Sequence, residues 1–509
     1  MSGPTIEASG GAAGEPKAPE ARRFRARAVC DPDAPTGRIV ATIGAPDSPG
    51  YADLEDIVGF GTIRLNLAFV EPQTYGDYRR LVRRIRERRG DAIGILLDCV
   101  GPRVKLGKLP REGVALREGA EVTLTTREGT EAGPDVLPSA LAELARLVRP
   151  GQPVVLDEGR MRLEVLRVEG ATDVRCVVRR GGRLKKRGLN LPETDVPLPA
   201  LSDRDRRDLA ALLEEDAVDM VALSFVRGPE DVAELRAFLR ERRRPDVRIM
   251  AKIETRQAVE AIDDIAAVSD ALMVARGDLW AELRNPWELP RITSRLIRAG
   301  NALGIPVVTA TQTLSSMVDR DVPSRAEVDE VYLLLGSGSD AIMGSEEFAV
   351  GRHPREVAAA IRAVSREVDR ERLEAARDGR PPERAAAATG EFGREKAAVA
   401  WAESAARVRC LVAISDFGKV ARQVCRERPR KPLVVATNVP ATARYLQLLG
   451  VYPVLVDYRW DDEDHAAIAR AALEALGWRG ADETAIVAVS HHAAPGRRYS
   501  KVEEVPLPR

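Results

Sequence analysis

The sequence predicts an α/β protein: a (β/α)8 TIM barrel with an inserted all-β domain and a second α/β domain at its C-terminal end. Short β-branched runs alternate with longer helical stretches, which is typical of a parallel sheet. Eight such runs occur, and eight parallel strands suit a closed barrel. The alternation is interrupted once by short strand-like runs separated by turns, which indicates the insert.

The predicted elements follow in chain order. The first three barrel strands are expected at residues 38–43, 62–66 and 93–98, with a helical pattern at 75–89. Runs such as 122–125, 153–156 and 174–178 belong to the insert. The last five barrel strands are expected at 220–225, 248–253, 271–275, 306–310 and 341–343. Candidate chemistry should therefore lie just after these strands, at their carboxyl ends.

The ends of the chain differ from the barrel in composition and pattern. Residues 1–35 are rich in Gly, Ala, Pro and Glu and lack apolar periodicity, so we expect a disordered tail. A charged helical connector at 366–390 precedes strands at 411–414, 432–436, 453–456 and 485–489. The predicted division is a tail at 1–35, barrel segments at 36–102 and 197–375, the insert at 103–196 and a C-terminal α/β domain at 386–509.

Composition excludes several classes of partner. The 78 basic residues equal the 78 acidic ones, which removes the general electrostatic argument for nucleic acid or an anionic membrane. The five cysteines form no CxxC pair, and this disfavours a disulfide framework or structural zinc. No apolar run is long enough to span a bilayer, and no signal core follows the N-terminus. We expect a cytoplasmic protein with no nucleic-acid or membrane partner.

Two carboxylates and a lysine follow or end predicted barrel strands. Glu254 in "AKIET" and Asp278 in "VARGDL" suit a hard divalent cation, which takes few protein carboxylates and leaves positions for substrate oxygens. Lys252 lies two residues before Glu254, so both side chains share one face of an extended segment. Such a lysine can offset the charge of a phosphoryl group in transfer. The alternatives are solvated surface carboxylates and an ordinary Lys–Glu ion pair.

Other candidates follow the same rule of position. Gly277 allows close approach of a small acid to backbone N–H groups. Thr311 in "TATQT" and Ser345 in "IMGSEE" can order water near an enolate, or simply cap helices. Three early strand-end residues either bind ligand or form a structural network closing the barrel: Arg64, Asn66 and Asp98.

Three stretches together resemble the pyruvate kinase family: "LPALSDRDRRDLAALLEEDAVDMVALSFVR", "AKIETRQAVEAIDDIAAVSDALMVARGDL" and "GIPVVTATQTLSSM". The similarity runs from about residue 38 to the C-terminus. It implies that the insert is a β lid, that the C-terminal domain is regulatory in type, and that the protein is a homotetramer. It also implies phosphate transfer from phosphoenolpyruvate to ADP with Mg²⁺, or Mn²⁺ in its place, followed by protonation of enolpyruvate.

The resemblance also implies roles for individual residues. Lys252 would stabilise the transferring phosphoryl group, and Glu254 and Asp278 would bind the metal. Arg64 would contact the phosphate. The substrate carboxylate would lie against Ala275, Arg276, Gly277, Asp278 and Thr311. Thr311 and Ser345 would support protonation of the enolate, and the nucleotide would lie near Arg64, Asn66, Lys105 and Arg187.

Departures from the family pattern affect the potassium and nucleotide sites. The usual "NFSHG" reads Asn66-Leu67-Ala68-Phe69-Val70, which removes a potassium-ligating serine and a histidine near the nucleotide. The remaining positions of this degraded potassium site are Asn66, Ala68, Asp98 and Cys99. Arg103 stands where potassium-dependent members carry glutamate and potassium-independent members carry lysine. A fixed charge there can substitute for the ion, so we expect activity without potassium.

Further departures keep other functions open. Lys105 replaces a usual arginine and Arg187 a usual lid lysine, which keeps charge but not geometry. Asp416 and Phe417 in the C-terminal loop are poor phosphate hosts, so activation by a sugar phosphate is not expected. Two alternatives to an active pyruvate kinase therefore stand: a catalytically weak paralogue with a regulatory or binding role, and a metal-dependent lyase acting on a pyruvate enolate.

Overall fold

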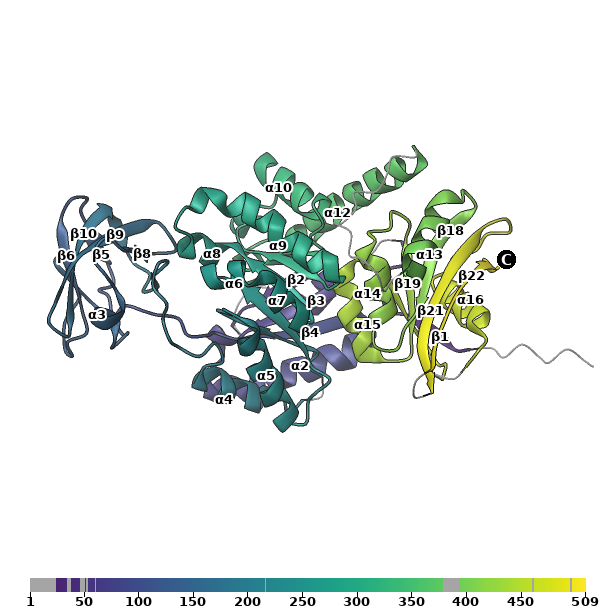
Figure 1. The fold of residues 1–509 in the computed structure, drawn as a ribbon, viewed down its shortest axis with the longest axis horizontal. Coiled ribbons are helices and arrows are strands. Elements are labelled where there is room, and N and C mark those ends of the chain that lie inside the picture. Colours follow the sequence, from purple (N-terminus) through teal and green to yellow (C-terminus); the bar gives the residue numbers. More distant parts are fainter. Residues whose placement is uncertain are drawn as a thin grey trace, which may run out of the picture.

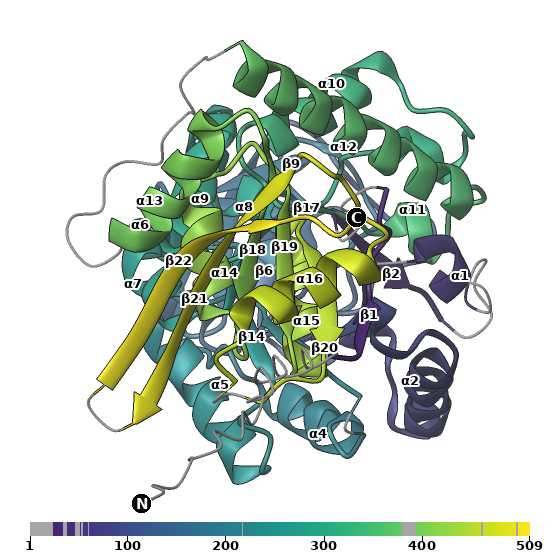
Figure 2. The ribbon, with the colours of Figure 1, turned by 90° about the vertical axis from the view of Figure 1, so that its right-hand side faces the viewer.

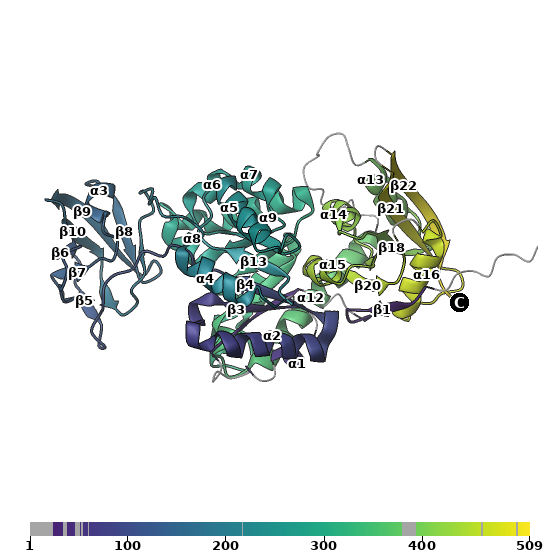
Figure 3. The ribbon, with the colours of Figure 1, turned by 90° about the horizontal axis from the view of Figure 1, so that it is seen from below.

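The computed structural model describes residues 24–33, 38–45, 51, 54–59, 61–215, 217–378, 393–459, 462–494 and 497–509. Three parts follow one another along the long axis of the molecule (Figure 1). The β insert lies at one end, the barrel in the centre and the C-terminal sheet at the other end. The view from below gives the same order (Figure 3).

The centre is a closed barrel of eight parallel strands, in the order β13-β14-β15-β16-β17-β2-β3-β4. Its strands are β2 (Ile39–Ile43), β3 (Gly61–Asn66), β4 (Ile93–Asp98), β13 (Met220–Leu223), β14 (Arg248–Ile253), β15 (Ala271–Ala275), β16 (Val307–Ala310) and β17 (Ala341–Gly344). All eight predicted barrel strands are present, and the predicted fold class is confirmed.

Helices surround the barrel. They are α1 (Leu54–Val58), α2 (Tyr75–Arg89), α4 (Asp203–Leu212), α5 (Pro229–Glu241), α6 (Arg256–Glu260), α7 (Ile262–Val268), α8 (Arg276–Glu282), α9 (Leu289–Leu303), α10 (Arg325–Gly336), α11 (Glu346–Ala349) and α12 (Pro354–Arg377). The predicted helical pattern at 75–89 coincides with α2. The predicted connector begins within α12, and its residues 379–390 lie outside the described residues.

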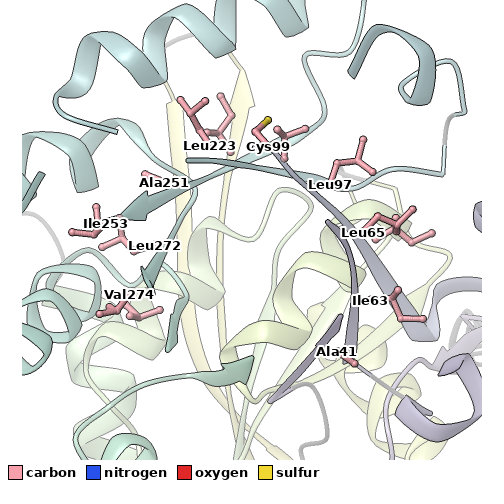
Figure 4. Packing of buried hydrophobic residues seen from close by; sticks show 14 of the residues in the cluster. Ala41, Ile63, Leu65, Leu97, Cys99, Leu223, Ala251, Ile253, Leu272 and Val274 are labelled. Carbon is pink, nitrogen blue, oxygen red and sulfur yellow. The ribbon is translucent and has the colours of Figure 1, made fainter. Parts of the chain in front are cut away.

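The two-residue period of the strands separates the outer face of the barrel from its interior. Outward residues such as Leu65, Leu97 and Ile253 belong to the buried apolar cluster that includes residues of the surrounding helices (Figure 4). Inward residues two positions before the strand-end charges, such as Leu96 before Asp98 and Met250 before Lys252, are apolar and share a cluster with the C-terminal unit. Polar inward residues are therefore left for the opposite, carboxyl ends of the strands.

The insert contains a six-stranded sheet and a two-stranded one, in the orders β12-β8-β9-β10-β6-β7 and β11-β5. Its elements are β5 (Val114–Leu116), β6 (Glu121–Thr125), β7 (Val136–Pro138), α3 (Leu144–Leu147), β8 (Pro153–Leu156), β9 (Met161–Glu169), β10 (Asp173–Arg180), β11 (Gly182–Leu184) and β12 (Leu189–Asn190). Residues such as Val122, Leu163 and Cys176 form its own buried core.

The C-terminal sheet has the order β1-β20-β19-β18-β21-β22, and its β21–β22 hairpin is prominent in Figure 2. Its elements are β1 (Ala26–Ala28), α13 (Gly393–Ser404), β18 (Val408–Ile414), α14 (Lys419–Arg426), β19 (Leu433–Thr437), α15 (Pro440–Leu446), β20 (Tyr452–Val456), α16 (His465–Ala475), β21 (Thr484–Ala494) and β22 (Arg497–Pro506). None of the helices in the described ranges is both long and apolar enough to cross a membrane.

The predicted disordered tail at 1–35 is wrong for its last part. Strand β1 pairs antiparallel with β20, with Ala26 opposite Val456 and Ala28 opposite Val454. This short edge strand takes its hydrogen bonds from a partner more than four hundred residues away, so its local sequence carries no periodic signal. Residues 1–23 and 34–35 lie outside the described residues.

Candidate active site

The carboxyl ends of the barrel strands bring charged side chains from three strands into contact. Lys252 of β14 lies 3.0 Å from Glu254 and 3.1 Å from Asp98 of β4, measured from its Nζ atom to the nearest carboxylate oxygens. Arg64 of β3 donates from Nε to the other Asp98 oxygen at 2.6 Å. It also donates from Nη1 to Thr42 Oγ1 at 2.8 Å. One carboxylate thus bridges two cations.

Burial makes these charges interdependent. Burial raises the pKa of Glu254, and although Lys252 opposes this effect, the pKa stays above its ordinary value. Burial alone would lower the pKa of Lys252, but the carboxylates of Asp98 and Glu254 outweigh it and raise the pKa. For Asp98, Lys252 and Arg64 overcome the effect of burial and hold the pKa below its ordinary value. Lys252 is therefore a buried, charged ammonium group.

Ser224 also belongs to this cluster, although sequence reasoning did not select it. Lys252 Nζ donates to Ser224 Oγ at 2.7 Å, and this hydroxyl donates to the Cys99 carbonyl at 2.7 Å. The next residue, Phe225, has a φ of +55° and donates its backbone N–H to Glu254 at 2.8 Å. Ser224 directly follows β13, so the rule of strand ends could have identified it.

Asp278 lies on the first turn of α8, which follows β15. Its charge adds to the rise in the pKa of Glu254, so the two carboxylates lie within electrostatic reach of each other. Arg103, at the start of the β lid, donates to Asp278 Oδ2 at 2.7 Å. This guanidinium also stacks over the Phe225 ring, with 5.7 Å between Cζ and the ring centroid. The residue expected to replace potassium thus contacts a candidate metal ligand.

A cavity of about 210 Å³ opens between the β lid and the barrel beside Asp278. Glu282 of α8 lines it and accepts a hydrogen bond of 2.7 Å from Asn190 of β12. Burial raises the pKa of Glu282 to about 7, with Asp278 and Glu254 adding to the effect. Sequence reasoning missed Glu282, although its position four residues after Asp278 places both on one face of α8.

The predicted carboxylate pocket lies where β15 passes into α8. Ala275 ends the strand and Arg276 begins the helix. Gly277 N–H was expected to be free for a ligand, but it donates to Thr311 Oγ1 at 2.8 Å. Thr311 has a φ of +68°, a conformation that is strained for a β-branched residue. Arg276 contacts Glu330 and donates to the Thr311 carbonyl at 2.8 Å.

Ser345 and Asn66 make hydrogen bonds to residues near them in sequence. Ser345 follows β17, and its backbone N–H donates to Glu347 at 2.7 Å. Asn66 caps a short 3-10 helix by accepting a hydrogen bond from Ala68 N–H at 3.0 Å. Cys99 is buried, and burial raises its pKa well above the ordinary value. Within the degraded potassium site, Asp98 is thus the residue that contacts cations, through Arg64 and Lys252.

Lys105 and Arg187 lie together at the base of the β lid. Arg187 donates from Nε to the Leu106 carbonyl at 2.8 Å, and Lys105 forms an isolated bridge with Gly188. Burial lowers the pKa of Lys105, and the nearby charges of Arg103 and Arg187 add to this effect. Among the described residues, the charges that act on Lys105 are those of arginines, and no carboxylate offsets them.

The donor set at the strand ends suits a hard divalent cation. Glu254 and Asp278 offer carboxylate oxygens, and because burial holds the pKa of Glu254 above its ordinary value despite Lys252, a bound cation would favour its charged form. In the described part of the chain, no group of three or more His, Cys, Asp or Glu residues has the geometry to hold a metal ion. Two carboxylates leave the other coordination positions to substrate and water.

Comparison with known proteins agrees with this arrangement. Residues 34–358 match the family model described as pyruvate kinase, barrel domain, and residues 395–497 match pyruvate kinase, alpha/beta domain. A pyruvate kinase of Methylorubrum extorquens is 34% identical over 90% of this chain and 95% of its own length. Pyruvate kinase 2 of Synechocystis sp. is 34% identical, with 82% of this chain and 70% of the relative covered. A pyruvate kinase of Corynebacterium efficiens is also 34% identical, with 84% and 88% covered. With both of its α/β parts matched, this chain belongs to the pyruvate kinase family.

Proposed function

We propose that this protein transfers the phosphoryl group of phosphoenolpyruvate to ADP, giving pyruvate and ATP in glycolysis. The observation that carries this proposal is the buried, charged Lys252 held between Asp98 and Glu254. Phosphoryl transfer needs a fixed positive charge where negative charge develops, in a site that excludes water. A lyase acting on a pyruvate enolate has no need of that charge. Membership of the family supports the same assignment.

The phosphoryl group would lie between Lys252 and Arg64. The P–O bond to the enol oxygen breaks, and a bond forms to the terminal phosphate oxygen of ADP. Lys252 offsets the charge on the transferring group, while Arg64, oriented by Asp98 and Thr42, contacts its oxygens. Lys105 and Arg187 at the base of the β lid, with Asn66, would lie along the nucleotide.

The carboxylate of the substrate would lie against the start of α8, near Ala275, Arg276, Gly277 and Asp278. Gly277 N–H is held by Thr311 Oγ1, so substrate binding exchanges that hydrogen bond for one to the carboxylate. Thr311 is then free to order the water that protonates the enolate, with Ser345 in support. The strained φ of Thr311 supports a functional role for this residue.

Membership of the family implies a divalent metal, which we propose to be Mg²⁺, or Mn²⁺ in its place, held by Glu254 and Asp278. When bound, the ion would offset charge on the substrate oxygens. Arg103 already supplies a fixed positive charge beside Asp278, which supports activity without potassium. The family resemblance supports a homotetramer and a cytoplasmic location.

A coupled assay with phosphoenolpyruvate, ADP and Mg²⁺, run with and without potassium, tests this proposal. We expect pyruvate formation in both conditions, and a loss in kcat of about 100-fold or more for Lys252→Met, because one transition-state charge is removed. Lys419→Met, at an exposed lysine of α14, is the matched control and should keep wild-type activity. Absence of pyruvate from the wild type would end the proposal, and strict dependence on potassium would end the role given to Arg103.

One observation favours a second candidate, a catalytically weak paralogue with a binding role. Phe69 is 45% exposed where the family carries residues that serve the nucleotide, so an apolar ring faces solvent there. In that case the protein would bind phosphoenolpyruvate and a divalent ion but would form pyruvate no faster than Lys252→Met. Calorimetric titration with phosphoenolpyruvate beside the coupled assay distinguishes the two candidates.

A further inference from the structure

A second cavity lies at the opposite end of the barrel strands, where the barrel meets α12 and the C-terminal sheet. Its volume is about 140 Å³, roughly ten times the ~10–15 Å³ that one water molecule requires. Arg38 lines it just before β2 and Asp340 just before β17. Arg372 lines it from α12, and Arg428 from the loop between α14 and β19. The cavity therefore joins parts of the chain that are far apart in sequence.

The charges around this cavity do not balance. Five cationic side chains line it: Arg38, Arg372, Arg428, Arg430 and Lys431. Two carboxylates line it, Asp340 and Asp369, and Glu403 lies beside it as the 2.8 Å partner of Arg430. Counted over the described residues, the cavity lining and Glu403 thus carry two more positive charges than negative ones. A dianion would neutralise them.

Arg38 is the least satisfied of these groups. It is 7% exposed, and its Nη2 donates to Asp369 at 2.7 Å. Its Nε and Nη1 atoms are buried without a hydrogen-bond partner in the part of the chain that the structure describes. The guanidinium lies against Gly450, where a Cβ atom would come within 2.7 Å of Nε. Such buried donors favour an acceptor that enters from outside the chain.

The other two arginines strengthen the positive field. Burial lowers the pKa of Arg372 to about 10, and the charges of Arg38 and Arg428 add to this effect more than Asp369 and Asp340 offset it. Arg372 lies 3.8 Å from Asp369, while Arg428 donates to Asp340 at 2.8 Å. Three guanidinium groups therefore converge with too few carboxylates to separate them.

We propose that this cavity binds a small tetrahedral dianion, inorganic phosphate or the phosphate group of a monoester, through Arg38, Arg372 and Arg428. Planar guanidinium groups match phosphate oxygens in pairs, and the excess of two positive charges matches the dianion. Strand β2 begins next to Arg38 and carries Thr42, the partner of Arg64, near its other end. The ligand would thus lie at the far end of a strand that supports the candidate active site, independently of the function proposed for that site.

Calorimetric titration of the full chain with inorganic phosphate, and separately with a hexose monophosphate, tests the proposal at constant ionic strength. We expect saturable binding that weakens about tenfold or more in Arg372→Met, because one planar guanidinium group is lost. Arg370→Met is the matched control, since this arginine lies on the same helix with its side chain 67% exposed. It should bind as the wild type does. Tighter binding of the monoester would identify an ester as the ligand, and equal or weaker binding would identify free phosphate.

The variant Lys252→Met distinguishes phosphate bound at the candidate active site from phosphate bound in this cavity. If phosphate binds in the cavity, Lys252→Met should keep the phosphate binding that Arg372→Met loses. If Arg372→Met does not fold, Arg372→Lys takes its place in the test. Lysine keeps the charge but not the planar guanidinium group, so this variant should bind phosphate at least about threefold more weakly. Absence of saturable binding in the wild type, or loss in Lys252→Met with none in the Arg372 variants, would overturn the proposal.

Discussion

Lys252 stays charged in a buried position because the carboxylates of Asp98 and Glu254 flank it. The strand period alone places Lys252 and Glu254 on one face, so their proximity was predictable from the sequence. Ser224 and Arg103 were harder to place, because their partners come from a neighbouring strand and from α8. A side chain on its own strand has a predictable direction, but its partner depends on the order in which strands join the barrel.

Glu282 should make the stability of the folded protein depend on pH. Its pKa of about 7 in the folded protein lies above the ordinary value, so the folded state holds a proton more tightly than the unfolded state. Stability should therefore fall as pH rises from about 4.5 to about 7, and then level off. Glu282→Gln should gain about 2 kcal/mol relative to the wild type between about pH 5 and about pH 8.

Chemical unfolding at a series of pH values, in buffer containing a metal chelator, measures this difference. Glu260→Gln is the control, since Glu260 is exposed on α6 and pairs with Arg256 at 2.8 Å. Its stability relative to the wild type should not depend on pH over this range. A pH-independent difference for Glu282→Gln would show that this carboxyl group ionises normally.

Among the elements, the barrel strands were predictable because each is a buried β-branched run followed by a helix. Strand β1 was not, since three residues at the edge of a sheet gain their stability from β20 and not from their own pattern. The same limit applies to the turn between β8 and β9, whose contact with α8 has no local signal. Gly159 in that turn lies against Trp280, where an added Cβ would come within 2.6 Å of the indole.

This contact gives a prediction for the attachment of the β lid to the barrel. Gly159→Ala should destabilise the protein by about 1–3 kcal/mol, because it combines a left-handed φ with overpacking against Trp280. Gly170→Ala is the matched control, since Gly170 also has a positive φ but no atom within 4 Å of an added Cβ. Thermal unfolding compares the two. Equal losses would mean that the turn does not pack on α8.

For the molecule as a whole, the C-terminal unit closes the bottom of the barrel. Tyr445 and Leu446 of α15 share a buried cluster with Leu96 and Met220 from the barrel interior. In the described part of the chain this packing fills the far end of the barrel, and the cavity beside Asp278 lies at the carboxyl ends of the strands, under the β lid. The sequence predicted both α/β parts, but it held no signal for this shared core, which depends on how the two parts meet.

The proposed phosphoryl transfer requires Lys252, Glu254 and Asp278 to act around one divalent ion. Electron paramagnetic resonance of Mn²⁺, with phosphoenolpyruvate present, measures the affinity of the ion for Glu254→Gln and for the control Glu260→Gln. We predict that Mn²⁺ binds about tenfold or more weakly to Glu254→Gln, because one of the two proposed carboxylate ligands is lost, and that its affinity for Glu260→Gln is unchanged. Equal Mn²⁺ affinity in Glu254→Gln and the wild type would show that Glu254 does not hold the ion.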